Sequence, residues 1–391
     1  MVKKKFLRVS TKLLLFFLII SLLIIFFSNP LDRSLKASFL LLDLVGPEKI
    51  KPINLFELKY LSTELEIKSS KRVISADLYR PDDNKKHAGL IFVHGLAPEG
   101  KDDTRLIPLI KSLVRSGFVV LVPDFLGMKS QRIRISDIEE IVDSFKYLYN
   151  LSDYIYQDKL GIMSFSYGVG PSLLASSDEE IRNLVKFIFC YGGYYDLKKV
   201  IAYVTTGHYE YKEESGYLEP YEHGKWLFLK LNLDLIEDEE DREVLEEISN
   251  IKIENAKANV YELQKKLGEE GLNIYNLLTN KDYKKVEDLI DKLNPKIKQY
   301  MEKLSPCSRI ENVKAYLLIA HGYPDYSIPH TESIRLAESV DKKNYHLAIL
   351  KIIGHTEVIE TRLTIKNILT FYIPEIYKGF LIVYDLMKQQ N

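Results

Sequence analysis

The chain has 391 residues, of which 46% are hydrophobic and 28% are charged, with a net charge of -1. This balance excludes a disordered chain, and the near-neutral charge gives no reason to expect a nucleic-acid partner. The length suits a large α/β domain that carries an insertion. The two cysteines, Cys190 and Cys307, do not match the spacing of a metal site, so we expect neither a metal nor another cofactor.

The N-terminus combines basic residues with an apolar run. Five basic residues precede the uncharged run 13–27. With residues 9–12 included, the run reaches the roughly 20 residues that a transmembrane helix needs. No small-residue cleavage site follows, so an uncleaved signal anchor within residues 1–45 is favoured over the cleaved signal peptide of a secreted or periplasmic protein. The basic excess predicts a cytoplasmic N-terminus, with the remaining chain on the extracytoplasmic side.

From residue 46 to 200 the sequence alternates between strand-like and helix-like segments. Residues 64–67 and 73–79 alternate in polarity, as two antiparallel strands with one solvent-exposed face would. Four strand-like, mostly apolar runs follow, with helical segments between them: 88–93, 118–122, 160–163 and 185–190. This succession predicts an α/β fold with a mostly parallel sheet and helices on both of its faces.

The pattern changes between residues 201 and 304. This stretch is rich in Glu, Lys, Asn and Tyr, has helical spacing around residues 286–293, and contains no clear buried-strand run. It predicts a helical cap insertion over the carboxyl ends of the strands. Strand-like runs return at 315–320 and 345–352, which places the second part of the core in residues 305–391.

Ser166 lies in a tight turn between an apolar strand and a helix. Residues 159–175 read KLGIMSFSYGVGPSLLA, and the small residues Ser164 and Gly168 allow the strand and the helix to approach closely. The pattern resembles the G-x-S-x-G nucleophile elbow of the α/β-hydrolase superfamily, with serine in place of the first glycine. The alternative is an ordinary strand-to-helix turn of a parallel sheet.

A second loop resembles the same superfamily. His94-Gly95 directly follows the strand run 88–93, as does the His-Gly pair at the start of the oxyanion loop in α/β hydrolases. The resemblance implies that the backbone N–H groups of Leu96 and Tyr167 form the oxyanion hole.

An acid and a histidine follow the serine in the order that the superfamily requires. Residues 321–329 read HGYPDYSIP and resemble its acid loop, and Gly354-His355 resembles its Gly-His loop. The resemblance implies a triad of Ser166, Asp325 and His355, in which His355 takes the serine proton and Asp325 orients the imidazole. Taken singly, either residue could instead belong to the start of a helix, and Asp196 is the alternative acid.

The resemblance covers roughly residues 60–200 and 305–370 and is strongest to the dienelactone-hydrolase and prolyl-oligopeptidase-like branch. Serine stands where dienelactone enzymes use cysteine, which counts against that specific reaction. The resemblance implies a serine hydrolase that cleaves a carboxylic ester or related acyl bond through an acyl-enzyme, and the predicted signal anchor would make this hydrolase membrane-anchored. Its substrate would be a small acyl or ester compound, either soluble or lipid-like. A serine peptidase and a non-catalytic, membrane-tethered binding module are the alternatives.

Overall fold

The structure is built around one large β-sheet. The computed structural model describes residues 31–45, 59–355, 359, 361–362 and 364–390. The strands of this sheet are β1 (Tyr60–Lys68), β2 (Val73–Pro81), β3 (His87–Val93), β4 (Phe118–Pro123), β5 (Ile155–Phe165), β6 (Phe187–Tyr191), β9 (Tyr316–Gly322) and β10 (Tyr345–Leu350). Their order is β1-β2-β4-β3-β5-β6-β9-β10. The strands from β4 to β10 pair parallel, whereas β2 is antiparallel to both β1 and β4. The prediction of a mostly parallel sheet is confirmed.

Alternate residues of the central strands face two separate hydrophobic cores. In β3, Leu90 and Phe92 face one core, whereas Ile91 and Val93 face the other. This division follows from the pleat, because successive side chains of a strand point to opposite faces. A strand that is covered on both sides must be apolar on both sides, which explains why β3 and β4 read as unbroken apolar runs.

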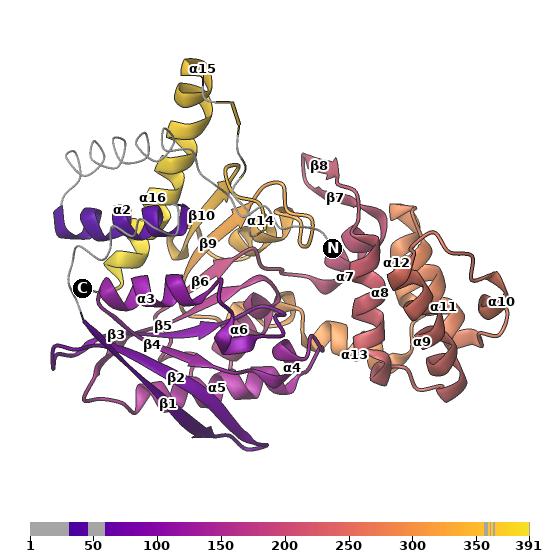
Figure 1. Cartoon of the computed structure of the whole chain (residues 1–391), viewed down its shortest axis with the longest axis horizontal. Helices are drawn as coiled ribbons and strands as arrows, with labels where there is room; N and C mark the ends of the chain where they lie inside the picture. The colour runs from indigo at the N-terminus through magenta and orange to yellow at the C-terminus, as the bar shows by residue number, and fades with distance from the viewer. Residues whose placement is uncertain (1–30, 46–58, 356–358, 360, 363, 391) are drawn as a thin grey trace.

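Helices cover both faces of the sheet (Figure 1). One core is closed by α2 (Leu31–Val45), α3 (Ile107–Arg115) and α16 (Ile373–Lys388), and the other by α5 (Ser136–Tyr149), α6 (Val169–Ser176) and α14 (Thr331–Glu338). Helix α3 illustrates the cause, because Leu109, Ile110, Leu113 and Val114 recur at helical spacing and are all buried.

The prediction of a transmembrane helix is corrected by the structure. A span needs about 20 residues, whereas the longest helices of the described residues, α9 (Glu239–Glu254) and α16, have 16 residues each. In this part of the chain no helix is both long and apolar enough to cross a bilayer. Residues 31–45 of the predicted anchor region form α2, which packs in the same core as α16. For the described residues, the predictions of a signal anchor, a cytoplasmic N-terminus and an extracytoplasmic location are therefore wrong. The apolar run 13–27 lies outside the described residues.

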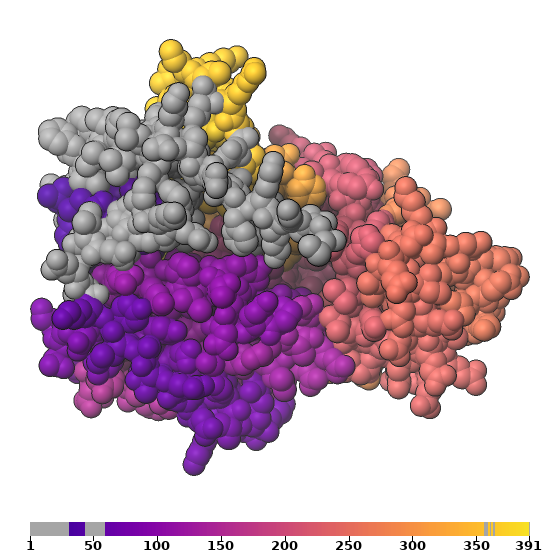
Figure 2. Space-filling view, viewed as in Figure 1, coloured from indigo at the N-terminus to yellow at the C-terminus, as the bar shows by residue number. Residues whose placement is uncertain are grey.

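The segment between β6 and β9 forms a lobe with its own small core. Its elements are α7 (Leu197–Thr206), β7 (His208–Tyr211), β8 (Glu214–Tyr217), α8 (Glu222–Leu231), α9, α10 (Tyr261–Gln264), α11 (Glu269–Thr279), α12 (Val286–Asp291) and α13 (Pro295–Lys303). The lobe lies at one end of the molecule (Figures 1 and 2), and Trp226, Leu245 and Ile248 are buried within it. The β7–β8 hairpin was not expected, because its strands carry only one buried side chain, that of Tyr209.

Helix α7 joins the lobe to the main body. Leu197 at its start packs in the core of the sheet, whereas Ala202 packs in the core of the lobe. The helix therefore crosses the predicted boundary between residues 200 and 201. The division into residues 46–200, 201–304 and 305–391 stays a prediction.

Candidate active site

Ser166 lies at the sharp turn that follows β5. Phe165 is still extended, with φ -128° and ψ 139°, whereas Ser166 has a φ of 53°. A non-glycine residue in this left-handed region costs on the order of 1–3 kcal/mol, so the surrounding structure must hold the turn in place. At Gly168 an added Cβ would lie 2.4 Å from the carbonyl oxygen of His94. The absence of a side chain at Gly168 therefore lets the elbow approach the loop after β3.

The loop after β3 runs directly beside the serine. A Cβ added at Gly95 would lie 3.1 Å from Ser166 Cβ and 3.6 Å from its Oγ. His94 is fully buried, and burial lowers the pKa of its imidazole, which favours the neutral form in a structural position. Leu96 follows Gly95 and Tyr167 follows Ser166, so the two predicted oxyanion-hole residues each adjoin this contact. Their role in an oxyanion hole stays a prediction.

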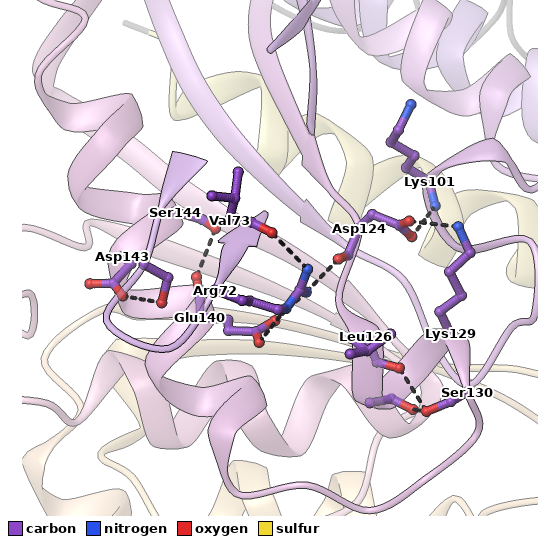
Figure 3. Close-up of polar contacts among 12 residues, drawn as sticks. Arg72, Val73, Lys101, Asp124, Leu126, Lys129, Ser130, Glu140, Asp143 and Ser144 are labelled. Atoms are coloured by element: carbon purple, nitrogen blue, oxygen red, sulfur yellow. Dashed lines mark hydrogen bonds and ion pairs between the residues drawn. The ribbon is translucent and has the colours of Figure 1, made fainter. Parts of the chain in front are cut away.

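Asp124, just after β4, holds this loop from its far end (Figure 3). Its Oδ1 accepts the backbone N–H of Lys101 at 3.3 Å, and its Oδ2 accepts Lys129 Nζ at 2.6 Å. Its carbonyl oxygen accepts Arg72 at 2.8 Å. Gly100 has a φ of 56°, and a Cβ there would lie only 2.0 Å from Asp124 Oδ1. Asp124 was not singled out as a site residue from the sequence, because its partners come from three separate segments.

Asp325 follows β9 and is 1% exposed. Its Oδ1 accepts the backbone N–H groups of Ser327 at 2.8 Å and Ile328 at 3.0 Å. Its Oδ2 lies 2.7 Å from His355 Nδ1 and 3.3 Å from His321 Nε2. Burial by itself would raise the pKa of Asp325, but the hydrogen bonds from His321 and His355 outweigh it and hold the pKa well below its usual range. The carboxylate is therefore ionised at neutral pH.

His355 follows β10 and is partly exposed, at 22% of its side chain. An ionised carboxylate can only accept hydrogen bonds, so Nδ1 of His355 carries the proton that faces Asp325. Nε2 is then the ring nitrogen that can take up a proton. At Gly192, after β6, an added Cβ would lie 3.7 Å from both Asp325 Oδ2 and His355 Nδ1. The structure thus brings Asp325 and His355 into direct contact.

Ser166 lies at the same edge of the sheet as this pair. Phe165 pairs with Tyr191 of β6, and Tyr191 pairs with Ala320 of β9. The chain therefore leaves β5 at Ser166 and leaves β6 at Gly192, on the side of the sheet where β9 ends. Asp196, the alternative acid, instead caps helix α7, where its Oδ1 accepts the backbone N–H of Lys198 at 2.9 Å.

His321 is a second imidazole beside the acid, and the sequence indicated it only as a structural loop residue. Its Nδ1 lies 2.7 Å from the Ser333 hydroxyl, and its Nε2 lies 3.0 Å from the carbonyl oxygen of Ile328. Because a carbonyl can only accept, Nε2 carries a proton and points toward Asp325 as well. The spacing of four residues between His321 and Asp325 in the H-G-x-x-D motif was the sequence signal that could have predicted this contact.

Comparison with known proteins identifies the fold. No family model matches the chain, and no curated protein matches its sequence. A candidate hydrolase from Legionella pneumophila is 15% identical, with a TM-score of 0.51, and the match covers 90% of this chain and 94% of that one. Together with the strand order, this likeness shows that the chain has the α/β-hydrolase fold, as expected from the sequence.

Two further solved structures are similar. The acylaminoacyl peptidase of Pyrococcus horikoshii is 15% identical with a TM-score of 0.47, and the match covers 85% of this chain and 42% of the peptidase. The chain therefore matches less than half of the length of that peptidase. A dienelactone hydrolase from Anabaena variabilis is 11% identical with a TM-score of 0.42, and the match covers 85% of this chain and 98% of that one.

Proposed function

We propose that the protein is a serine hydrolase that cleaves a carboxylic ester or a related acyl bond through an acyl-enzyme. The observation that carries the proposal is the 2.7 Å contact between Asp325 and His355. It lies at the sheet edge where Ser166 occupies a positive-φ turn. A nucleophile, a base and an orienting acid at one edge of a sheet suit acyl transfer.

In the proposed acylation step, Ser166 Oγ attacks the carbonyl carbon of the substrate while His355 Nε2 takes its proton. The backbone N–H groups of Leu96 and Tyr167 stabilise the oxyanion of the tetrahedral intermediate. His355 then gives the proton to the leaving oxygen as the carbon–oxygen bond breaks, which leaves the acyl group on Ser166. An alcohol is released.

In the proposed deacylation step, His355 takes a proton from water, and the hydroxide formed attacks the acyl carbon. The proton returns to Ser166 Oγ as the second carbon–oxygen bond breaks, and a carboxylic acid is released. Asp325 remains ionised throughout, because its pKa is held well below the usual range. Its negative charge stabilises the imidazolium that forms in both steps. No bound metal or cofactor is needed for these steps.

A fluorophosphonate probe tests the proposal. We expect the probe to label the wild type, and we expect Ser166→Ala to abolish labelling while leaving the unfolding temperature nearly unchanged, since alanine keeps the Cβ and removes only the hydroxyl. The matched control is Ser164→Ala, two residues earlier, whose hydroxyl donates to the carbonyl of Phe189 at 3.3 Å. This control should retain labelling.

Substrate assays on the labelled protein then separate the reaction classes. p-Nitrophenyl esters of graded chain length and peptide anilides are compared at equal concentration. Preference for esters supports the proposal, and preference for anilides would identify a peptidase on the same fold. A well-folded wild type that neither binds the probe nor hydrolyses either series would show a non-catalytic protein and would overturn the proposal.

A further inference from the structure

The lobe contacts the acid loop through one buried tyrosine. Tyr203 lies on α7 and is 2% exposed. Its hydroxyl donates to the backbone carbonyl oxygen of Asp325 at 2.5 Å. Burial raises the pKa of Tyr203 far above its usual value, so the hydroxyl keeps its proton and remains a donor at neutral pH. The partners are 122 residues apart in sequence.

This hydrogen bond acts on the part of Asp325 that its side-chain partners do not reach. The carboxylate is held by Ser327, Ile328 and the two imidazoles, whereas the backbone carbonyl is held by Tyr203. Because the peptide unit is planar, tilting this carbonyl also moves the N–H of Tyr326 and the backbone that leads to Ser327 and Ile328, whose N–H groups bind the carboxylate. The hydroxyl of Tyr203 therefore helps to set the position of the carboxylate relative to His355.

The Tyr203 ring stands at one end of a series of aromatic contacts that leads to the acid loop. The ring of Tyr209, on β7, lies edge-on to it with the centroids 6.0 Å apart. The Tyr209 ring also lies 5.3 Å from His330, whose ring lies 4.8 Å from Tyr323 of the acid loop. His330 Nε2 in turn lies 3.1 Å from Glu214 Oε2 on β8. The hairpin, α7 and the acid loop therefore pack as one unit.

We propose that Tyr203 is a positioning residue of the active site, through which the lobe sets the geometry of the Asp325–His355 pair. The inference rests on the proposed function, since it assigns a role to Tyr203 in that same site. A lobe with its own core would otherwise be expected to fold and move independently of the sheet. Here its first helix supplies a hydrogen bond to the acid, so the active site is incomplete without the lobe.

Tyr203→Phe removes this one hydroxyl and keeps the ring. We expect kcat on a reactive p-nitrophenyl ester to fall about tenfold, with KM changed less than about twofold, because the defect affects the reacting groups and not the bound substrate. A displaced Asp325 stabilises the imidazolium less well. The acidic limb of the pH profile of kcat/KM should therefore move to lower pH.

The matched control is Tyr275→Phe. Tyr275 lies on α11 in the lobe, and its ring centroid is 6.0 Å from that of Trp226. This variant removes a tyrosine hydroxyl from the same lobe without touching the acid loop. Its kcat, KM and pH profile should match those of the wild type, whereas a purely structural effect of the lobe would reduce activity in both variants.

The downfield proton resonance of His355 Nδ1–H provides a readout that needs no turnover. We expect it to shift upfield in Tyr203→Phe, as the hydrogen bond to Asp325 lengthens, and to stay in place in Tyr275→Phe. If the probe does not label the wild type, the proposed function is refuted, and the His355 resonance alone then decides the positioning role of Tyr203. Unchanged resonance and unchanged kcat in Tyr203→Phe, in a labelled wild-type background, would overturn the positioning role alone.

A second variant covers the case in which Tyr203→Phe does not fold. Tyr209→Phe removes the hydroxyl that faces Tyr323 and leaves every hydrogen bond of Asp325 in place. It should move the His355 resonance in the same direction by a smaller amount. If the His355 resonance does not move in this variant, the aromatic contacts between α7, the hairpin and the acid loop do not set the position of Asp325, and the proposal fails.

Discussion

Two buried carboxylates, one in the acid loop and one at the start of α5, have pKa values that are shifted in opposite directions. Asp325 is 1% exposed and has donors on both oxygens, which hold its pKa well below the usual range. Asp137 is 0% exposed, and neither of its oxygens forms a well-aligned hydrogen bond among the described residues, although Gly127 lies against them. Burial, followed by the charge of Glu140, raises the pKa of Asp137 to about 7.

The comparison shows that partners, and not depth, decide whether a buried acid is ionised. A carboxylate that leaves water loses its solvation, and only hydrogen-bond donors or opposite charges replace it. Two backbone N–H groups and two imidazoles do so for Asp325. Around Asp137 the neutral form is favoured instead. The acid loop is thus built to hold a negative charge, and the start of α5 is not.

The largest expected effect is on turnover by Asp325→Asn. An amide cannot supply the negative charge that stabilises the imidazolium, and it favours the wrong tautomer of His355, so we expect kcat to fall roughly 10³- to 10⁴-fold. Asp196→Asn is the matched control, because Asp196 caps α7, and it should keep activity within a few-fold. Equal activity in the two variants, measured by ester hydrolysis, would show that Asp325 is not the acid.

The same substitution should also change stability in a pH-dependent way. The pKa of Asp325 is lower in the folded state than in the unfolded state, so its stabilising contribution is present above about pH 4 and is lost as the pH falls below that. We expect Asp325→Asn to cost about 2–4 kcal/mol at pH 7. The loss in free energy of unfolding should be smaller near pH 3, as measured by urea unfolding of the wild type and the variant. A cost that is the same at both values would argue against an ionised Asp325.

We expect Asp137→Asn to change the free energy of unfolding in the opposite direction, and by the smallest amount. The folded pKa of Asp137 is raised to about 7, above its unfolded value, so the wild type loses stability as the pH rises from about 4 to about 7. The amide avoids this loss and should stabilise the protein by about 1–3 kcal/mol at pH 8 and by less at pH 5. Urea unfolding at the two pH values measures the difference, and a destabilised variant at pH 8 would contradict the raised pKa.

Much of the sheet and the chain positions of the site could be predicted from sequence. The buried runs that became β3, β4 and β9 were found because strands covered on both faces must be apolar throughout. Asp325 and His355 were singled out as the candidate acid and base because each follows such a run in a recognisable loop. Asp325 and His355 were placed in contact by the structure, whereas the roles of these residues and of Ser166 remain to be tested by the variants above.

Other features could not be predicted for identifiable reasons. The β7–β8 hairpin carries little apolar patterning, because Tyr209, which packs on Tyr203 and His330, is the only buried side chain of its two strands. The predicted transmembrane helix rested on hydropathy in the run 13–27, and among the described residues no helix could span a membrane. Asp137 resembles any polar residue at a helix start until its burial is known.

The sequence by itself determined the strands of the main sheet, their alternation with helices and the chain order of the candidate serine, acid and histidine, because hydrophobic periodicity and turn motifs are local signals. Only the tertiary structure decided that α7 belongs to two cores and that Tyr203 donates to the backbone of Asp325. It alone also separated an ionised buried acid from one whose neutral form is favoured. These properties depend on groups that lie far apart in the chain and meet only when the sheet and the lobe are folded together.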